Sequence, residues 1–345
     1  MKAVLARRYG PPESLTVEDI PSLVPKAGEV SVAVHASAVN FPDTLMIQDK
    51  YQIRPELPFS PGGEVAGTIK SLGEDVSGFA VGDAVIAACR YGGFADEVLT
   101  TPDRLVAIPA GVSMEGGAAL LITYGTTHYA LRDRASIQPG ETLLVLGAAG
   151  GTGISAIELG KLMGARVIAC ASSEEKLSLC RACGADATID YEREDLRARV
   201  KELTGGRGVD VVYDPVGGAY AEPALRGMAW RGRYLVIGFA AGDIPRLPLN
   251  LPLLKGCSIV GVFYGAFATA EPERYAELRE ELVGWLAQGR IRPTITARYP
   301  IERGPEALRL VADRKAVGKI MLTTALGRAS GTVGPLTADL TMAKG

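Results

Sequence analysis

A glycine-rich turn between an apolar run and an amphipathic run limits the fold of this chain more than any other feature. Residues 143–146 are apolar and predict a buried strand, and the segment GAAGGTGISA follows at once. Gly151, Gly153 and Ala156 fit the pattern G-x-G-x-x-A where a helix begins. Small residues are needed there because the turn is tight and the backbone approaches a pyrophosphate. We therefore predict a dinucleotide site. Its predicted cofactor-binding residues in the turn are Gly150, Gly151, Thr152 and Gly153.

The runs on either side of this turn predict two kinds of sheet. Before about residue 110, short apolar runs such as VSVAVHASAV and GGEVAGTI are broken by Gly and Pro, which is typical of β-strands. From Thr142 the chain alternates strand, turn and helix, and runs such as VDVVYD are apolar enough to be buried on both faces. The fold class predicted for this part is α/β, with a doubly wound parallel sheet. The run KIMLTT predicts a last strand that returns to the first domain.

Charge and composition exclude several classes of partner. The 37 basic and 39 acidic residues give a net charge of −2, without a basic block that could follow a nucleic-acid backbone. No apolar run approaches the ~18 residues of a membrane span. The five cysteines are an odd number scattered through apolar patterns, and no signal peptide precedes them. We expect a soluble chain in the cytoplasm, with neither nucleic acid nor membrane as a partner.

The end of the second predicted strand bears on which dinucleotide binds. An NAD site needs an acidic residue about 20 residues after the first glycine, where it binds the ribose 2′-hydroxyl. This chain has Ala171, Ser172 and Ser173 at that point, and Lys176 follows. Serines and an ammonium can bind a 2′-phosphate, so the sequence favours NADPH over NAD. The alternative is that Lys176 is an ordinary solvated charge and that Glu174 and Glu175 oppose a phosphate.

Several motifs together resemble the medium-chain dehydrogenase/reductase superfamily, in the quinone oxidoreductase branch that includes zeta-crystallin. They are the segment from Asn40 to Asp43, Tyr51, PELPFSPGGEVAGTIKSLGEDVSGFAVGDAV and the turn AAGGTG. The resemblance implies a GroES-like β-barrel catalytic domain joined to a Rossmann domain. The implied boundaries are 1–123 and 264–326 for the catalytic domain and 124–263 for the NADP(H)-binding domain. The segment from Gly327 is small, polar and rich in glycine, so we expect residues 327–345 to form a flexible tail.

The resemblance also raises the question of zinc, which the superfamily's alcohol dehydrogenases carry. Where those enzymes have a cysteine this chain has Asn40, and where they have the histidine of a G-H-E motif it has Gly63. Glu64 remains, but a zinc site requires three N, S or O side chains. Cys89 stands alone where a structural zinc needs four close cysteines. We predict no metal.

The resemblance assigns further site residues. Asn40 and Tyr51 are the catalytic candidates, and Tyr51 either protonates the substrate or only lines its pocket, because a phenol with a pKa of about 10 is a reluctant acid. Phe239 and Phe263 follow predicted parallel strands, at the ends where ligands bind such sheets. The residues implied to contact the cofactor are Asn40, Thr126, Tyr191, Phe239, Phe263 and Tyr264, with Ser172, Ser173 and Lys176 at the 2′-phosphate.

These expectations describe a zinc-independent, NADPH-dependent reductase that works in a cleft between two domains. Its acceptor would be a small electrophile, either a quinone or an α,β-unsaturated carbonyl compound. Two alternatives stay open: an NADPH-dependent enoyl-CoA reductase, whose basic entrance could use Lys50, Arg54 and Arg90, and an NADPH-binding structural or regulatory protein with little turnover. The family further implies a homodimer, with CSIVGVF as the candidate edge strand.

Overall fold

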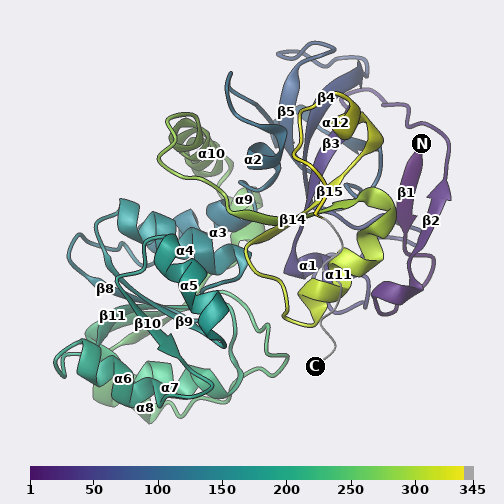
Figure 1. The fold of residues 1–345 in the computed structure, drawn as a ribbon. Helices are drawn as coiled ribbons and strands as arrows, with labels where there is room; N and C mark the ends of the chain where they lie inside the picture. The colour runs from purple at the N-terminus through teal and green to yellow at the C-terminus, as the bar shows by residue number, and fades with distance from the viewer. Residues whose placement is uncertain (338–345) are drawn as a thin grey trace. The chain divides into compact units, whose positions relative to one another are not determined.

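The computed structural model describes residues 1–337 and divides into two compact units. Unit 1 joins residues 1–122 with the chain from Val283 onward, and unit 2 runs from Thr123 to Leu282 (Figure 1). The second boundary therefore lies later than the expected residue 264. The reason is that α9 and the part of α10 up to Leu282 belong to unit 2. Their bounds are α9 Tyr264–Ala270 and α10 Pro272–Ala287.

Aromatic and charged contacts hold these two helices against the start of unit 2. Phe267 of α9 stacks on Tyr129, with ring centroids 4.2 Å apart. Glu281 of α10 accepts a hydrogen bond from His128 Nε2 at 2.8 Å. Apolar spacing in the sequence predicts that such helices pack, but it does not say against which domain.

Unit 2 contains the predicted doubly wound parallel sheet. Its six strands lie in the order β10-β9-β8-β11-β12-β13, and every neighbouring pair is parallel. From β8 the chain continues through β9 to β10 at one edge of the sheet. It then returns to β11, which lies on the other side of β8, and continues through β12 to β13 at the opposite edge. The strand order therefore reverses between β8 and β11. The carboxyl ends beside such a reversal are where ligands bind in open α/β sheets. The strands are β8 Thr142–Val145, β9 Arg166–Ala171, β10 Ala187–Asp190, β11 Val209–Asp214, β12 Met228–Val236 and β13 Ser258–Gly261.

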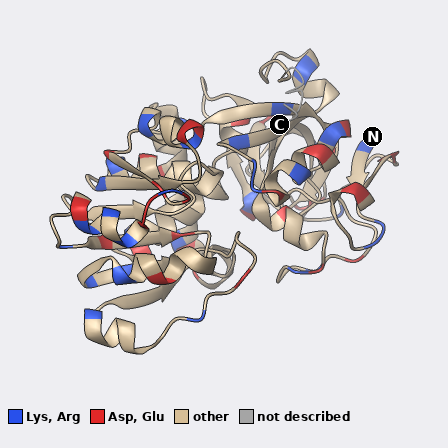
Figure 2. Cartoon of the chain, turned by 60° about the horizontal axis from the view of Figure 1, so that its bottom comes forward, with Lys and Arg blue, Asp and Glu red and all other residues tan. Residues whose placement is uncertain are grey.

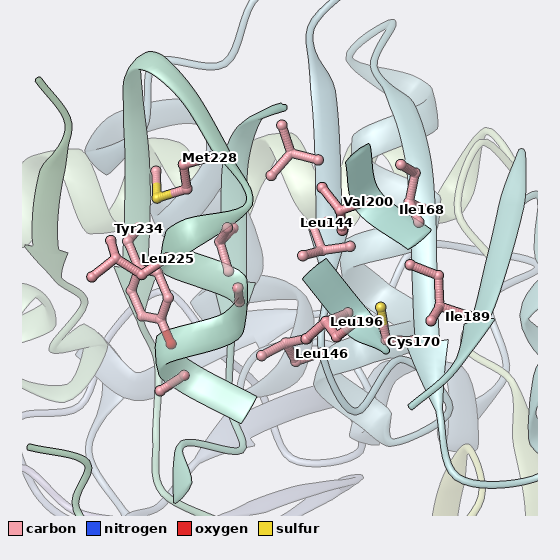
Figure 3. Packing of buried hydrophobic residues seen from close by; sticks show 14 of the residues in the cluster. Leu144, Leu146, Ile168, Cys170, Ile189, Leu196, Val200, Leu225, Met228 and Tyr234 are labelled. Carbon is pink, nitrogen blue, oxygen red and sulfur yellow. The ribbon is translucent and has the colours of Figure 1, made fainter. Parts of the chain in front are cut away.

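Helices cover both faces of this sheet. Figure 1 shows α3, α4 and α5 on one face and α6, α7 and α8 on the other. Beneath the second group, the buried side chains of one core cluster interdigitate, among them Leu144 and Ile168 from the strands and Leu196 and Val200 from α6 (Figure 3). The continuous apolar strands are thus buried on both sides, as predicted. The helices are α3 Thr123–His128, α4 Gly151–Leu162, α5 Glu174–Ala182, α6 Leu196–Leu203, α7 Ala221–Arg226 and α8 Asn250–Lys255.

Unit 1 is built on a seven-stranded sheet. The strand order is β14-β15-β3-β4-β5-β7, and β6 pairs with β3. The long central strand β3 is almost entirely buried. β15 pairs antiparallel with β3, so the end of the chain does return to the first domain. The strands are β3 Val30–Val39, β4 Glu64–Leu72, β5 Ala84–Ala88, β6 Glu97–Thr100, β7 Leu105–Ala107, β14 Ile295–Pro300 and β15 Lys319–Thr323, and a separate pair is β1 Lys2–Leu5 with β2 Thr16–Asp19.

The described part of the last segment differs from the flexible tail expected from residue 327. After β15 the chain forms the short helix α12, Ala325–Ala329. Thr332 Oγ1 then lies 2.7 Å from Nδ1 of the buried His35 in β3, and Thr337 N donates to Arg298 O at 3.1 Å. Small polar residues form these bonds with unit 1, which composition alone does not indicate. Residues 338–345 of the expected tail lie outside the described residues. The remaining helices of unit 1 are α1 Phe41–Met46, α2 Met114–Ala118 and α11 Gly304–Ala312.

Charged residues of both signs are scattered over each unit (Figure 2). Many of them are paired, as Arg233 is with Glu141 at 2.7 Å. Among the helices that the structure describes, none has the length and apolar character required to cross a membrane.

Candidate active site

The glycine-rich turn has the geometry that its sequence predicts. β8 ends at Val145, and α4 begins at Gly151 with Gly150 as an N-cap that has no side chain. A Cβ on Gly153 would lie 2.4 Å from Gly147 O and 2.6 Å from Ala148 Cα. Both neighbours are backbone atoms, so nothing larger than glycine fits. The backbone therefore stays bare around the α4 N-terminus, whose N–H groups favour a phosphate.

The end of β9 carries hydroxyls and an ammonium. Lys176 Nζ donates to Ser172 Oγ at 3.0 Å, and Ser173 Oγ caps α5 by accepting from Lys176 N at 3.4 Å. Glu174, which could have opposed a phosphate, pairs instead with Arg181 along α5 and has a largely exposed side chain. The structure thus brings Ser172, Ser173 and Lys176 together at the end of β9.

Tyr191 lies directly after β10, beside the end of β9. Its N–H donates to Ala171 O at 3.2 Å, and its ring contacts that of Tyr220 with centroids 4.2 Å apart. The turn, the serines and Tyr191 therefore follow three neighbouring strands, β8, β9 and β10. Their carboxyl ends lie at one edge of the sheet, because parallel strands run in one direction.

A buried carboxylate shapes the loop on the other side of the strand reversal. Asp214, the last residue of β11, accepts the N–H groups of Val216 and Gly217 at 2.7 and 2.8 Å and the hydroxyl proton of Tyr234. Burial raises the pKa of this carboxyl. The loop bends so that Gly217 has φ +67°, and a Cβ there would lie 2.9 Å from the ring of Phe239. Phe239 therefore packs beside the carboxyl end of β11.

The three other aromatic and hydroxyl candidates of unit 2 lie in different surroundings. Phe263 follows β13 and is 56% exposed. Tyr264 begins α9, and its hydroxyl lies 2.1 Å from the place where a Cβ on Gly125 would stand. This puts Tyr264 against α3, where the half-buried Thr126 is the next residue.

A buried hydroxyl cluster supports the start of α4, and the sequence did not single it out. Thr127 Oγ1 lies 2.7 Å from Ser155 Oγ and 2.9 Å from Tyr213 OH. All three side chains are fully buried. They tie α3, α4 and β11 together beneath the glycine-rich turn. The signal in the sequence was Tyr213 inside the apolar run VDVVYD. A buried tyrosine hydroxyl usually needs a hydrogen-bond partner, so its position in a buried strand indicates a polar contact.

Unit 1 contains a buried polar cluster around Asn40, at the end of β3. Lys319 Nζ donates to Asn40 Oδ1 at 2.7 Å, and Asn40 Nδ2 donates to Glu64 Oε2 at 3.4 Å. Asp43 accepts the N–H of Asn40 at 2.8 Å and that of Gly62 at 3.2 Å. These four side chains are each at most 5% exposed. Glu64 also accepts the N–H of Ile122 at 2.9 Å.

Burial governs the ionisation of this cluster. It raises the pKa of Asp43 to about 6 and that of Glu64 to about 7, although the Lys319 ammonium and backbone N–H groups oppose both shifts. It lowers the pKa of Lys319, while the two carboxylates act in the opposite direction. Burial likewise raises the pKa of the nearby Cys89 thiol to about 12, so this cysteine is not a reactive thiolate.

Tyr51 lies in the loop after α1, partly buried against an apolar cluster of unit 1. Burial and the negative charge of Asp43 raise the pKa of its phenol. The hydroxyl therefore keeps its proton, and it is better suited to donating a hydrogen bond than to releasing a proton outright.

The residues present do not fit a zinc ion. Gly63 has no ligand atom, and a Cβ there would lie 3.2 Å from Arg90 O and 3.3 Å from Ile122 Cδ1. Next to Asn40, the Lys319 ammonium supplies a positive charge that repels a metal ion. Within residues 1–337, no three His, Cys, Asp or Glu side chains are arranged to hold a metal.

Comparisons with known proteins agree with this geometry. Residues 26–123 match the family described as alcohol dehydrogenase GroES-like domain, and residues 151–283 match the family described as zinc-binding dehydrogenase. The chain is 38% identical over 327 residues to a quinone oxidoreductase-like protein 2 homolog of Nematostella vectensis, covering 94% of this chain and 89% of that protein.

Solved structures give the same result. Escherichia coli quinone oxidoreductase complexed with NADPH has a TM-score of 0.88 at 29% identity, covering 94% of this chain and all of that one. The CurK enoyl reductase has a TM-score of 0.83 at 28% identity, covering 94% and 98%. With an identity of 38% across nearly the whole chain, the protein belongs to the quinone oxidoreductase-like branch of the medium-chain dehydrogenase/reductase superfamily of oxidoreductases.

Proposed function

We propose that the protein is a zinc-independent, NADPH-dependent reductase of quinones or α,β-unsaturated carbonyl compounds. The observation that carries the proposal is the end of β9, where Ser172, Ser173 and Lys176 lie together in place of a carboxylate. An ammonium and two hydroxyls favour a 2′-phosphate, which NADPH has and NADH lacks. The NADPH complex of the Escherichia coli relative supports the same cofactor.

In this proposal, the other candidate residues contact the pyrophosphate, the adenine or the nicotinamide of the cofactor. The bare backbone of Gly150, Gly151, Thr152 and Gly153 holds the pyrophosphate at the α4 N-terminus. Tyr191 lies beside the adenine. The residues that border the nicotinamide are Asn40, Thr126, Phe239, Phe263 and Tyr264.

The chemistry follows from the side chains present. Bound NADPH supplies a hydride, which reduces the acceptor as the cofactor is oxidised to NADP⁺. Asn40, Gly63 and the Lys319 ammonium do not offer the ligands that a zinc ion needs to activate a simple alcohol, so we propose an acceptor that is already electron-poor. When an enone carbon accepts the hydride, negative charge develops on the carbonyl oxygen. Tyr51 donates a hydrogen bond to this oxygen, and one proton from solvent completes the reduction.

A second candidate is an enoyl-thioester reductase, which the similarity to the CurK enoyl reductase favours. The basic entrance that such an enzyme needs for CoA phosphates would use Lys50, Arg54 and Arg90. Arg54 already pairs with Asp49 at 3.2 Å, and Lys50 Nζ donates to Gln48 at 3.0 Å. These contacts weaken the case for CoA relative to a small acceptor.

We also propose a homodimer that forms through β13. This strand lies at the edge of the unit 2 sheet, as the candidate edge CSIVGVF requires. Unit 2 also has large apolar side chains exposed on β12, β13, α8 and the loops beside them. They are Trp230, Ile244, Leu249, Leu253, Leu254, Ile259 and Phe263. Ile259 lies on β13 itself, and an unpaired strand edge pairs readily with a second copy.

The test is the rate of NADPH oxidation, with NADH alongside, against a benzoquinone, a polycyclic quinone, an alkenal and a short enoyl-CoA. Turnover of quinones or the alkenal with NADPH preferred supports the proposal. Turnover of the enoyl-CoA alone favours the thioester reductase. Tight NADPH binding without turnover of any acceptor favours a binding protein.

The variant Ser172→Asp tests the cofactor assignment directly. A carboxylate at the end of β9 repels a 2′-phosphate, so the affinity for NADPH should fall by about 10-fold or more while that for NADH does not. Ser178→Asp places the same charge on an exposed position of α5 and serves as the matched control. An equal NADPH loss in both variants contradicts the assignment.

A further inference from the structure

The first turn of α4 lacks the features that usually hold the start of a helix in place. Its N-cap is Gly150, which has no side chain to accept an N–H, and its first three residues include Gly151 and Gly153. The first bond within the helix runs from Ile154 N to Gly150 O at 2.8 Å. Glycine loses more conformational freedom in a helix than any other residue, so this turn needs contacts from elsewhere to stay ordered.

Buried hydroxyls supply such contacts at Thr152, the residue between the two glycines. Ser155 Oγ donates to Thr152 O at 2.9 Å, and Thr127 Oγ1 lies 3.5 Å from the same carbonyl oxygen. The side chain of Thr152 also forms a hydrogen bond with the hydroxyl of Tyr213. Thr152 is therefore held at both its carbonyl group and its side chain.

The proton of each hydroxyl has one place in this network. Ser155 Oγ contacts two carbonyl oxygens, those of Thr152 and Thr123, and a carbonyl can only accept a hydrogen bond. With the serine proton used there, Thr127 donates to Ser155 at 2.7 Å and Tyr213 donates to Thr127 at 2.9 Å. The Tyr213 oxygen then accepts the proton of the Thr152 hydroxyl. The chain of hydrogen bonds thus begins and ends at Thr152.

Tyr213 is the member of this network that lies in the sheet. It is fully buried in β11, and burial raises the pKa of its phenol, so the hydroxyl stays protonated. Its backbone pairs with Val145, the last residue of β8, from which the glycine-rich turn follows. The Tyr213 hydroxyl therefore connects the first turn of α4 to the centre of the parallel sheet.

We infer that Tyr213 is a positioning residue for the pyrophosphate of the cofactor: through Thr152 it holds the first turn of α4 so that the N–H groups of this turn face the pyrophosphate. The inference rests on the proposed function, which assigns the pyrophosphate to this turn. Tyr213 is buried and acts through Thr152 rather than by contact with the cofactor. Because the Thr152 hydroxyl donates inward, Thr152 binds the phosphate with its backbone N–H.

The first test compares two ligands that differ in the pyrophosphate. ADP-ribose contains it, whereas 2′-AMP contains only the adenosine and the 2′-phosphate. In calorimetry, Tyr213→Phe should bind ADP-ribose about 5- to 10-fold more weakly than the wild type does, because the hydrogen bond to Thr152 is lost. Its affinity for 2′-AMP should stay within about 2-fold of the wild type. An unchanged affinity for ADP-ribose, or an equal loss for both ligands, overturns the inference.

Tyr124→Phe is the matched control. Tyr124 is a buried tyrosine of α3, and its hydroxyl donates to Glu158 in the middle of α4, away from the first turn. The control therefore removes the same group from a contact with the same helix. Its affinity for ADP-ribose should stay within about 2-fold of the wild type. An equal loss in Tyr124→Phe and Tyr213→Phe overturns the specific role of Tyr213.

A second variant tests whether Tyr213 acts through Thr152. Thr152→Val removes the hydroxyl and keeps the backbone N–H, so it should weaken ADP-ribose binding by about the same factor as Tyr213→Phe. Because both substitutions remove the same hydrogen bond, the double variant should lose no more affinity than either single variant. Losses that multiply overturn the inference. If Tyr213→Phe fails to fold, Thr152→Val decides alone, and an unchanged affinity for ADP-ribose then overturns it.

Hydrogen exchange separates this inference from the proposed function, because it needs no ligand. The amide of Ile154, which forms the first bond of α4, should exchange at least about 10-fold faster in Tyr213→Phe, while the amides of the last turn of α4 keep their rates. An unchanged Ile154 amide overturns the inference. If the wild type binds neither ADP-ribose nor NADPH, the proposed function fails, and the Ile154 amide still decides whether Tyr213 holds this turn.

Discussion

The substitution Glu64→Gln should change how the stability of unit 1 depends on pH. The Glu64 carboxyl is fully buried, and burial raises its pKa from 4.5 to about 7. Between these two pH values, the folded protein keeps a proton that the unfolded chain has released. The contribution of this carboxyl to the free energy of unfolding is therefore largest below pH 4.5 and is lost as the pH rises through 7.

The magnitude follows from the two pKa values. Each unit of pKa difference corresponds to 1.36 kcal/mol, and the part of the titration that falls between pH 5 and pH 8 amounts to about 2.5 kcal/mol. Glutamine has no proton to lose. The free energy of unfolding of Glu64→Gln relative to wild type should therefore rise by about 2.5 kcal/mol from pH 5 to pH 8. The hydrogen bonds that glutamine loses are a constant offset and do not affect this slope.

Urea unfolding followed by tryptophan fluorescence can measure the slope in unit 1 alone. The chain has two tryptophans, the buried Trp285 in unit 1 and the exposed Trp230 in unit 2. In a Trp230→Phe background, Trp285 reports on unit 1. Asp43, whose pKa is raised to about 6, titrates in both proteins and largely cancels in the difference. Parallel pH profiles for the two proteins, within about 0.5 kcal/mol, would refute the reasoning.

Three other substitutions test the remaining features. Gly153→Ala places a Cβ 2.4 Å from Gly147 O, so NADPH affinity measured by fluorescence should fall by about 10- to 100-fold; wild-type affinity would contradict the tight turn. Gly284→Ala adds a methyl where nothing lies within 4 Å in α10, and thermal unfolding should show about 1 kcal/mol of added stability; a destabilised variant would contradict this. Ile259→Arg places a charge on the exposed face of β13, and sedimentation should show a monomer if the proposed dimer forms through this strand; a dimeric variant would move the interface elsewhere.

Much of unit 2 could be predicted from the sequence. The glycine spacing, the apolar strands and the change to alternating helices are local patterns, because backbone sterics and the burial of parallel strands act over a few residues. The same holds for Ser172, Ser173 and Lys176, which lie within one turn of each other. The end of unit 2 was placed too early because the packing of Phe267 on Tyr129 joins residues far apart in the chain.

The cluster around Asn40 shows what only the tertiary structure decided. The sequence indicated Asn40 as a site residue and excluded zinc ligands at Asn40 and Gly63 by residue type alone. It gave no sign of Lys319, which is 279 residues away and meets Asn40 because β15 pairs with the end of β3. The fold thereby places a buried lysine ammonium 2.7 Å from the Asn40 amide oxygen. Spacing along a chain records turns, strands and helices, whereas strand register and burial, which depend on the whole fold, decide which distant side chains meet and how they ionise.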